Sequence, residues 1–361
     1  MGEKMLVSSP PAFAVVISTG SCSLFHSYFP QRKISSRSSS VRFLKSRKKS
    51  CFAPKIHFER EICFECSSSV LEPTGDSSEL RQRFFEEVTK PDADIDLGIA
   101  SALVSCMTEC RDLDVSTVSS ALDDLAKEVA KRLLDAPPYP LRVIQTIKNF
   151  LDEQGFEGDK DHFYYPRAAL INEVLTTKKG MTVTLCIVWL EIARRIGFPM
   201  TAVDIPHHIL LRPDFSESEF PELDIFVDPF CQGEVLFRDD CYQLISSIHD
   251  IPIDDPRLKD EKHFKKVSNK DVLLRLLRHL KEIYLYLKEE DKAYSITEML
   301  ALMNSMHPTD HRDYGKILYA RQQWASAEAE LAIYLALRPN AEDFHLIHEM
   351  LRDIKGNCKG S

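Results

Sequence analysis

The sequence predicts an α+β fold that is mostly helical, with a small antiparallel sheet near the middle and a helical tail. Three observations predict this fold. Apolar residues recur every three or four positions over residues 95–155 and 268–355, which is typical of amphipathic helices. Three short β-rich segments lie between these two ranges. A faint spacing of about 34 residues in the tail is typical of a helical repeat.

Residues 1–58 differ from the rest in composition. They contain ten Lys or Arg, thirteen Ser and a single acidic residue, which leaves 36 basic and 54 acidic residues for the remainder. A basic, Ser-rich and acid-poor segment is typical of an organelle transit peptide. A disordered basic tail that binds an anionic surface is the alternative. We predict a transit peptide and disordered leader over 1–66, a linker over 67–94, and localisation in the chloroplast, in the stroma.

The whole-chain composition excludes several classes of protein. With 44% hydrophobic and 9% aromatic residues among 361, the chain can fill a core and is not wholly disordered. The longest apolar stretch near the start, residues 12–17, is far shorter than a membrane span of about 20 residues. A net charge of −9 argues against a nucleic-acid partner. Cys63 and Cys66 lack the second pair that a zinc site needs, so no metal or other cofactor is expected.

Residues 95–155 form the predicted N-terminal helical segment. Asp112 and Asp114 break the first pair of helices, and the proline-rich residues 136–140 end the second helix. A third helix continues to Gly155, a residue type that commonly ends helices.

Residues 156–258 form the predicted mixed core. One helix begins at Pro166 or Arg167, and a stronger one covers about 182–196 before Gly197. The expected strands are the β-rich segments 201–204, 208–212 and 224–228. Turn residues separate these segments, which favours antiparallel pairing.

Residues 268–355 form the predicted repeat tail, and the charged run 259–270 reads as a solvated linker. Leu285 matches Tyr319 and Ala293 matches Ala327, each 34 residues later. This spacing, with small residues where helices cross, is typical of tetratricopeptide repeats. Two units bury too little surface alone, so we expect them to stack on the preceding domain.

The order of a helix start, His208 and Asp228 is the layout of a papain- or transglutaminase-type site. In such a site the helix N-terminus lowers the pKa of a nucleophilic thiol. The His takes the proton of the thiol, and the Asp fixes the tautomer of the His. His208 also has a structural interpretation, as a histidine that is hydrogen-bonded to Asp228.

The sequence resembles the SirB-like branch of the transglutaminase-like superfamily, in a plant plastid-type form. That branch joins a transglutaminase-like core to tetratricopeptide-like helices. The resemblance covers about residues 95–355, and the motifs that carry it are residues 163–167, 170–175, 179–185, 191–197, 205–212, 227–233, 311–315 and 329–335. Taken together these motifs are specific, although each alone is weak.

The resemblance implies that the position of the nucleophile, about fifteen residues before Gly197, is occupied by Thr182. An internal Thr lacks the free α-amine that Thr nucleophiles use as a base. Two alternative nucleophiles remain. Cys186 lies one turn further on the same helix face, among apolar neighbours that predict burial and a raised pKa. Cys231 lies in a loop after Asp228.

Two functions follow from these residues. The first is a non-enzymatic plastid protein that binds a protein or peptide partner, a basic one by charge, through a degenerate transglutaminase-like domain and a repeat tail. The second is a cysteine-dependent acyl-transfer enzyme or peptidase that uses Cys186 or Cys231 with His208 and Asp228. Thr182 discriminates between them, and it favours the first.

Overall fold

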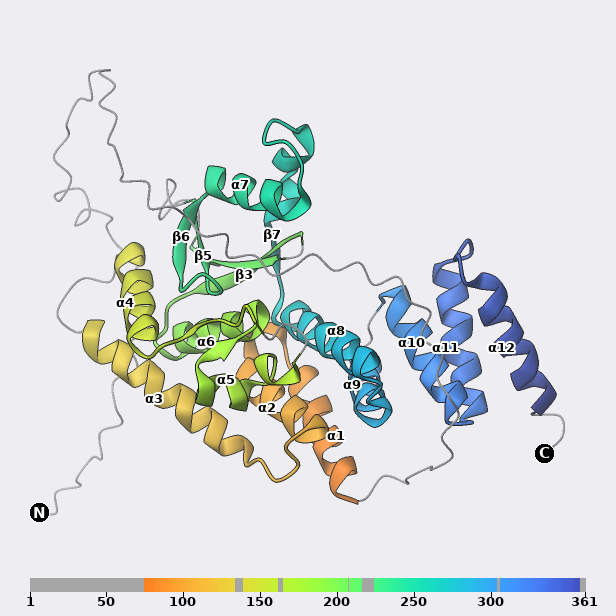
Figure 1. Cartoon of the computed structure of the whole chain (residues 1–361). Coiled ribbons are helices and arrows are strands. Elements are labelled where there is room, and N and C mark those ends of the chain that lie inside the picture. The colour runs from red at the N-terminus through yellow and green to blue at the C-terminus, as the bar shows by residue number, and fades with distance from the viewer. Residues whose placement is uncertain are drawn as a thin grey trace, which may run out of the picture. The chain divides into compact units, whose positions relative to one another are not determined.

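The structure, a computed structural model, describes residues 75–133, 139–161, 165–206, 208–215, 224–303 and 306–357 (Figure 1). All of these residues belong to one unit of the chain, Phe52–Ser361. The predicted transit peptide, the Cys63–Cys66 pair and His207 lie outside the described residues.

Four helices precede the sheet, and one of them corrects the sequence prediction. They are α1 (Gly75–Val88), α2 (Leu97–Thr108), α3 (Val115–Leu133) and α4 (Pro140–Glu153). Helix α1 lies within the segment that was interpreted as a linker. Its apolar residues Leu80, Phe84 and Val88 recur every four positions, and Phe84 and Val88 are fully buried. This short stripe packs α1 against α2, although charged residues surround it in the sequence.

The three helices predicted over residues 95–155 are present. The side chain of Asp96 caps α2 by accepting a 2.8 Å hydrogen bond from the backbone N–H of Ile99. Gly155 follows α4 with a φ of +84°, a left-handed conformation that favours glycine. Local capping chemistry therefore sets both boundaries, of which the sequence indicated the one at Gly155.

The sheet is antiparallel and has five strands in the order β6-β5-β4-β3-β7. They are β3 (Met200–Ile205), β4 (His208–Pro213), β5 (Ile225–Asp228), β6 (Glu234–Phe237) and β7 (Lys265–Val267). The three predicted strands, β3 to β5, are confirmed, whereas β6 and β7 were missed. Strand β7 lies in the run 259–270 that was interpreted as a linker. It is a short edge strand whose two lysines are exposed, so it shows no apolar alternation.

The two faces of the sheet bury different helices. Alternate strand residues, among them Ile209, Leu211 and Val227, join the main core. The intervening residues Leu210 and Phe226 join a second cluster with helix α7 (Arg238–His249), which the sequence analysis missed. Figure 1 shows α6 and α7 on opposite sides of the sheet.

Helix α6 (Thr182–Arg195) is the central helix of the core. It follows α5 (Ile171–Thr177) and a short parallel pair of strands, β1 (Glu157–Gly158) and β2 (Lys179–Gly180). Eleven of the fourteen residues of α6 are buried, from Val183 to Ala193. A helix that is buried on all sides must pack against several elements, and α6 contacts α2, α3, α8 and strands β3 and β4.

The tail consists of helices packed in pairs, as predicted. They are α8 (Asn269–Leu287), α9 (Glu290–Leu302), α10 (Pro308–Ala320), α11 (Trp324–Leu337) and α12 (Phe344–Asn357). The matched residues Ala293 and Ala327 are both fully buried. Leu273 and Leu276 of α8 belong to the same buried cluster as α6, so the tail stacks on the preceding domain.

Candidate functional site

The candidate site lies where α6 packs against the strand end that carries His208. Leu211 of β4 pairs with Val227 of β5, and this register places His208 and Asp228 at the same end of the two strands. Nε2 of His208 lies 3.1 Å from Oδ1 of Asp228. This is an ion-pair distance rather than a well-aligned hydrogen bond. The structure therefore brings together the two residues that the sequence pattern had singled out.

The loop after β5 holds the Asp228 carboxylate in place. Its Oδ1 accepts backbone hydrogen bonds from Phe230 at 2.9 Å and from Cys231 at 3.4 Å. The ring of Phe230 packs edge-on against the His208 ring, with centroids 6.4 Å apart. The exposed fractions of the His208 and Asp228 side chains are 11% and 3%. The pair is thus nearly closed to solvent.

The ionisation of Asp228 is set by opposing effects. Burial raises the pKa of the carboxyl, but the neighbouring His208 and hydrogen bonds from Cys231 outweigh burial and hold the pKa below its ordinary value. Asp228 is therefore present as a buried carboxylate with local partners. Such a carboxylate can orient a histidine, and it can equally serve as a structural link between β4 and the loop.

The loop geometry depends on Gly233. Its φ of +69° lies in the left-handed region, and a Cβ at this position would meet the ring of Trp189 of α6 at 2.5 Å. Its N–H also donates to the carbonyl of Asp228 at 2.8 Å. Close approach of this loop to α6 therefore fixes Asp228 against the core.

Thr182 is the first residue of α6, at the helix N-terminus, and it is half-buried. Among the described residues, no hydrogen bond joins Thr182 to His208. A hydroxyl without a base in hydrogen-bond reach remains protonated and weakly nucleophilic. The structure thus places Thr182 at the start of α6, and within the described ranges no hydrogen bond joins its hydroxyl to a base that would activate it.

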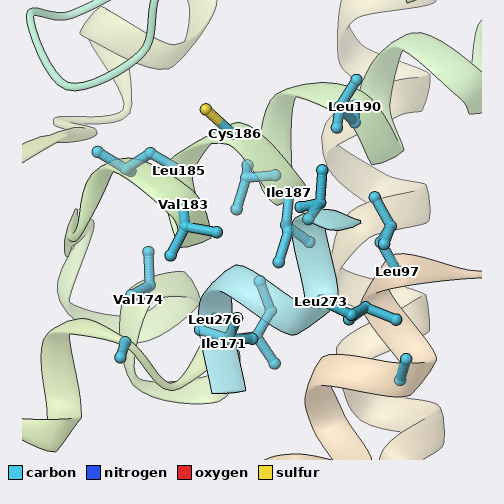
Figure 2. Close-up of a cluster of buried hydrophobic side chains, with 14 of the residues drawn as sticks. Leu97, Ile171, Val174, Val183, Leu185, Cys186, Ile187, Leu190, Leu273 and Leu276 are labelled. Atoms are coloured by element: carbon cyan, nitrogen blue, oxygen red, sulfur yellow. The ribbon is translucent and has the colours of Figure 1, made fainter. Parts of the chain in front are cut away.

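Cys186 is fully buried one turn further along α6. Figure 2 shows Val183 and Ile187 directed toward the α8 leucines, whereas the Cys186 sulfur points to the other side of α6. There Sγ lies 3.8 Å from the carbonyl oxygen of Ile209 on β4. Burial raises the pKa of the thiol well above its ordinary value, and the charge of Asp228 raises it further. The predicted burial of Cys186 is confirmed.

Cys231 is the thiol in direct contact with the pair. It is only partly buried, and both its thiol and its backbone N–H donate hydrogen bonds to Asp228. The structure therefore joins Cys231, Asp228 and His208 in one cluster.

Two polar networks near the core escaped the sequence analysis. Buried Glu191 of α6 accepts from the backbone N–H of Leu97 at 2.9 Å and pairs with Arg194 and Arg195. The second network, Lys281 with Asp310 and Asp313, connects α8 to α10 at 2.8 Å. The Glu191–Leu97 and Lys281–Asp310 contacts join residues far apart in the chain, and no local sequence pattern predicts them.

A hollow of about 380 Å³ lies in the tail, lined by residues of α9, α10 and α11. It was also missed, because its lining residues come from three helices.

Among the described residues, no group of three or more His, Cys, Asp or Glu could hold a metal ion. No described helix is long and apolar enough to cross a membrane.

Two family profiles match this chain. The Transglutaminase-like superfamily matches residues 116–278, and the Tetratricopeptide repeat matches residues 280–352. The chain therefore contains a transglutaminase-like domain followed by tetratricopeptide-like repeats. The first match begins within α3, so it also covers α3 and α4, which precede the predicted core of residues 156–258.

Bacterial proteins are similar in sequence to this chain over most of their own length. A UPF0162 protein of Xylella fastidiosa is 22% identical over 71% of this chain and 89% of its own length. The UPF0162 protein PA3419 of Pseudomonas aeruginosa is 28% identical over 53% of this chain and 66% of its own. A crystal structure of menin, reported with its binding site for the Mixed Lineage Leukemia protein, has a TM-score of 0.35. The menin sequence is 11% identical to this one, and the match covers 80% of this chain and 76% of the menin chain.

Proposed function

We propose that this chain is a non-enzymatic binding protein, in which a degenerate transglutaminase-like domain supports a repeat tail that binds a protein partner. One observation carries the proposal: Thr182 occupies the helix start where the superfamily layout needs a thiol, and no described hydrogen bond connects it to His208. Without a base, an internal Thr hydroxyl cannot begin acyl transfer at neutral pH. The tetratricopeptide-like match supports the binding role.

The surroundings of the His208–Asp228 pair support a structural use of these residues. Asp228 accepts two backbone N–H groups of its own loop, and Phe230 packs against His208. These contacts tie strand β4 to the loop after β5. A pair that is nearly closed to solvent leaves little access for a peptide or acyl substrate.

The cellular setting is also part of the proposal. The basic, Ser-rich composition of residues 1–58 supports import into the chloroplast and removal of this leader. Together with the motifs quoted above, it supports a plastid-type member of the SirB-like branch. Expression of the full chain with a C-terminal fluorescent protein tests this directly: plastid fluorescence and a shortened product are expected, and a cytosolic full-length product would contradict it.

The binding role is tested by recovery of partners from chloroplasts. The tagged full chain and a Cys186→Ala, Cys231→Ser double variant are purified in parallel, and the bound proteins are identified by mass spectrometry. The double variant removes both alternative nucleophiles, so the account expects the same bound proteins with either chain. An acyl or peptidyl adduct on Cys186 or Cys231 of the wild-type chain would contradict a non-enzymatic role.

A second candidate function rests on Cys231. Its thiol contacts Asp228 beside His208, and it is less buried than Cys186. Rotation of this side chain toward His208 would assemble a Cys–His–Asp set for acyl transfer or peptide hydrolysis. Cys231→Ser would abolish such an activity, whereas a binding protein would be unaffected.

A further inference from the structure

The tail offers a partner only part of its surface, because the core domain covers the rest. The first helix of the tail, α8, buries Leu273, Leu276 and Leu280 in the same cluster as α2 and α6. Its Lys281 is also committed, to Asp310 and Asp313 of α10. The second helices of the two pairs are α9 and α11. Helix α9 also packs against α1 and α2, so it offers another molecule only the part that lines the hollow described above.

The hollow described above lies between these two second helices. Ala301 of α9 and Ala329 of α11 form part of its lining, and their small side chains leave room there. Tyr314 of α10 also lines it. With about 380 Å³, the hollow lies at the lower end of the range of small-ligand pockets, about 300–1,000 Å³. It is large enough for one long side chain of a partner.

Two carboxylates give the hollow its charge. Glu298 of α9 and Glu330 of α11 line it from opposite helices. Glu298 is paired with Arg81 of α1 at 2.8 Å, so its charge is partly compensated. Glu330 contacts Nδ1 of His311 through Oε2 at 2.8 Å, and within the described ranges its Oε1 accepts no hydrogen bond. Glu330 therefore keeps an acceptor for an incoming donor.

The aromatic lining favours a cation as well. Burial raises the pKa of the Tyr314 hydroxyl, and the neighbouring Tyr294 and the carboxylates of Glu298 and Glu330 raise it further. The negative potential of both carboxylates therefore reaches this ring. Aromatic faces attract Lys and Arg side chains, and half-buried carboxylates form charge-assisted hydrogen bonds with both.

We propose that this hollow binds a Lys or Arg side chain in a peptide segment of the protein partner, with Glu330 as the principal acceptor. The proposal rests on the proposed binding function and names the chemistry of the partner. The charge of the hollow favours a basic segment over an acidic or purely apolar one.

The test uses a phage library of random linear peptides, selected on the full chain. Peptides that bind are then measured by fluorescence anisotropy against four variants. Glu330→Gln removes the negative charge of this side chain but keeps an acceptor for His311. Its control, Glu328→Gln, removes one negative charge from α11 at a position outside the hollow. Ala329→Phe fills the hollow, and Ala336→Phe adds the same bulk two turns away at an exposed position.

The proposal expects selected peptides that share a Lys or Arg whose replacement by norleucine weakens binding. Glu330→Gln should weaken binding by about tenfold or more, and Ala329→Phe similarly, while both controls bind as wild type does. Binding that is unchanged by both hollow variants would overturn this inference and leave the binding function intact. Failure to select any peptide would contradict both.

Discussion

The His208–Asp228 pair and the tail hollow both combine carboxylates, histidine and aromatic rings, yet their surroundings differ. In the core, Asp228 is 3% exposed and its Oδ1 accepts two backbone N–H groups. In the tail, Glu330 is 19% exposed and lines a hollow. In the first arrangement the carboxylate is held by groups of its own loop, whereas the second leaves acceptor capacity for another molecule. Residue types alone therefore do not tell a structural pair from a binding site.

The largest expected effect comes from removing the buried carboxylate. Asp228→Ala should lower the free energy of unfolding by about 3–5 kcal/mol, because it leaves His208 and the Phe230 N–H without their partner. Urea unfolding measures this change. If Asp228→Ala left the free energy of unfolding unchanged or raised it, the pair would be kept for a reaction rather than for the fold.

Two glycines separate backbone strain from packing around this pair. In Gly233→Ala the added methyl group would collide with Trp189, and alanine would also have to adopt the left-handed conformation of this position. We therefore expect the free energy of unfolding to fall by about 2–4 kcal/mol. Gly155→Ala shares the positive φ but meets no atom within 4 Å, and it should cost only about 1 kcal/mol. Thermal and urea unfolding measure both losses. If the two variants lost the same free energy of unfolding, the loop would not press on α6.

The pH dependence of stability offers a smaller but specific effect. Because the folded chain lowers the pKa of Asp228, its ionised form stabilises the fold at pH values above about 3.9, the ordinary carboxyl pKa. That contribution is lost as the pH falls through the lower pKa of the folded state. The stability difference between wild type and Asp228→Asn should therefore shrink between pH 6 and pH 3. A constant or growing difference would contradict the lowered pKa.

The smallest effect is expected in the tail. Glu330→Gln should change the free energy of unfolding by less than about 1 kcal/mol, since Glu330 is only partly buried and Gln retains an acceptor for His311. Glu328→Gln provides the matched control on the same helix. A loss comparable to that of Asp228→Ala would place Glu330 among the structural carboxylates and remove the contrast between the two regions.

The sequence predicted what local patterns control. Apolar spacing placed α2, α3, α4 and α6, and β-rich runs placed β3 to β5. The helix predicted from Pro166 or Arg167 begins only at Ile171, as α5, after a short 3-10 turn. Helix α1 and strand β7 were missed because charged residues dominate their segments and only tertiary contacts hold them. The hollow could not be predicted, because it depends on how three helices pack around Ala301 and Ala329.

The site was predictable in its residues but not in its accessibility. His208 and Asp228 were singled out by their order in the chain, and the antiparallel register does bring them together. Cys186 was expected to be buried from its apolar neighbours, and it is. The contact between the Cys231 thiol and Asp228 depends on the path of the five-residue loop 229–233, which contains two positive-φ residues, and no sequence spacing reveals that path.

Thiol reactivity tests the central claim, a transglutaminase-like core without a working nucleophile, most directly. The full chain is treated with iodoacetamide near neutral pH, and the rate at each described cysteine is followed by peptide mass spectrometry, in wild type and in His208→Ala. The account predicts that Cys186 and Cys231 react no faster than an ordinary thiol, with or without His208. A single fast-reacting cysteine at either position, slowed by His208→Ala, would contradict it.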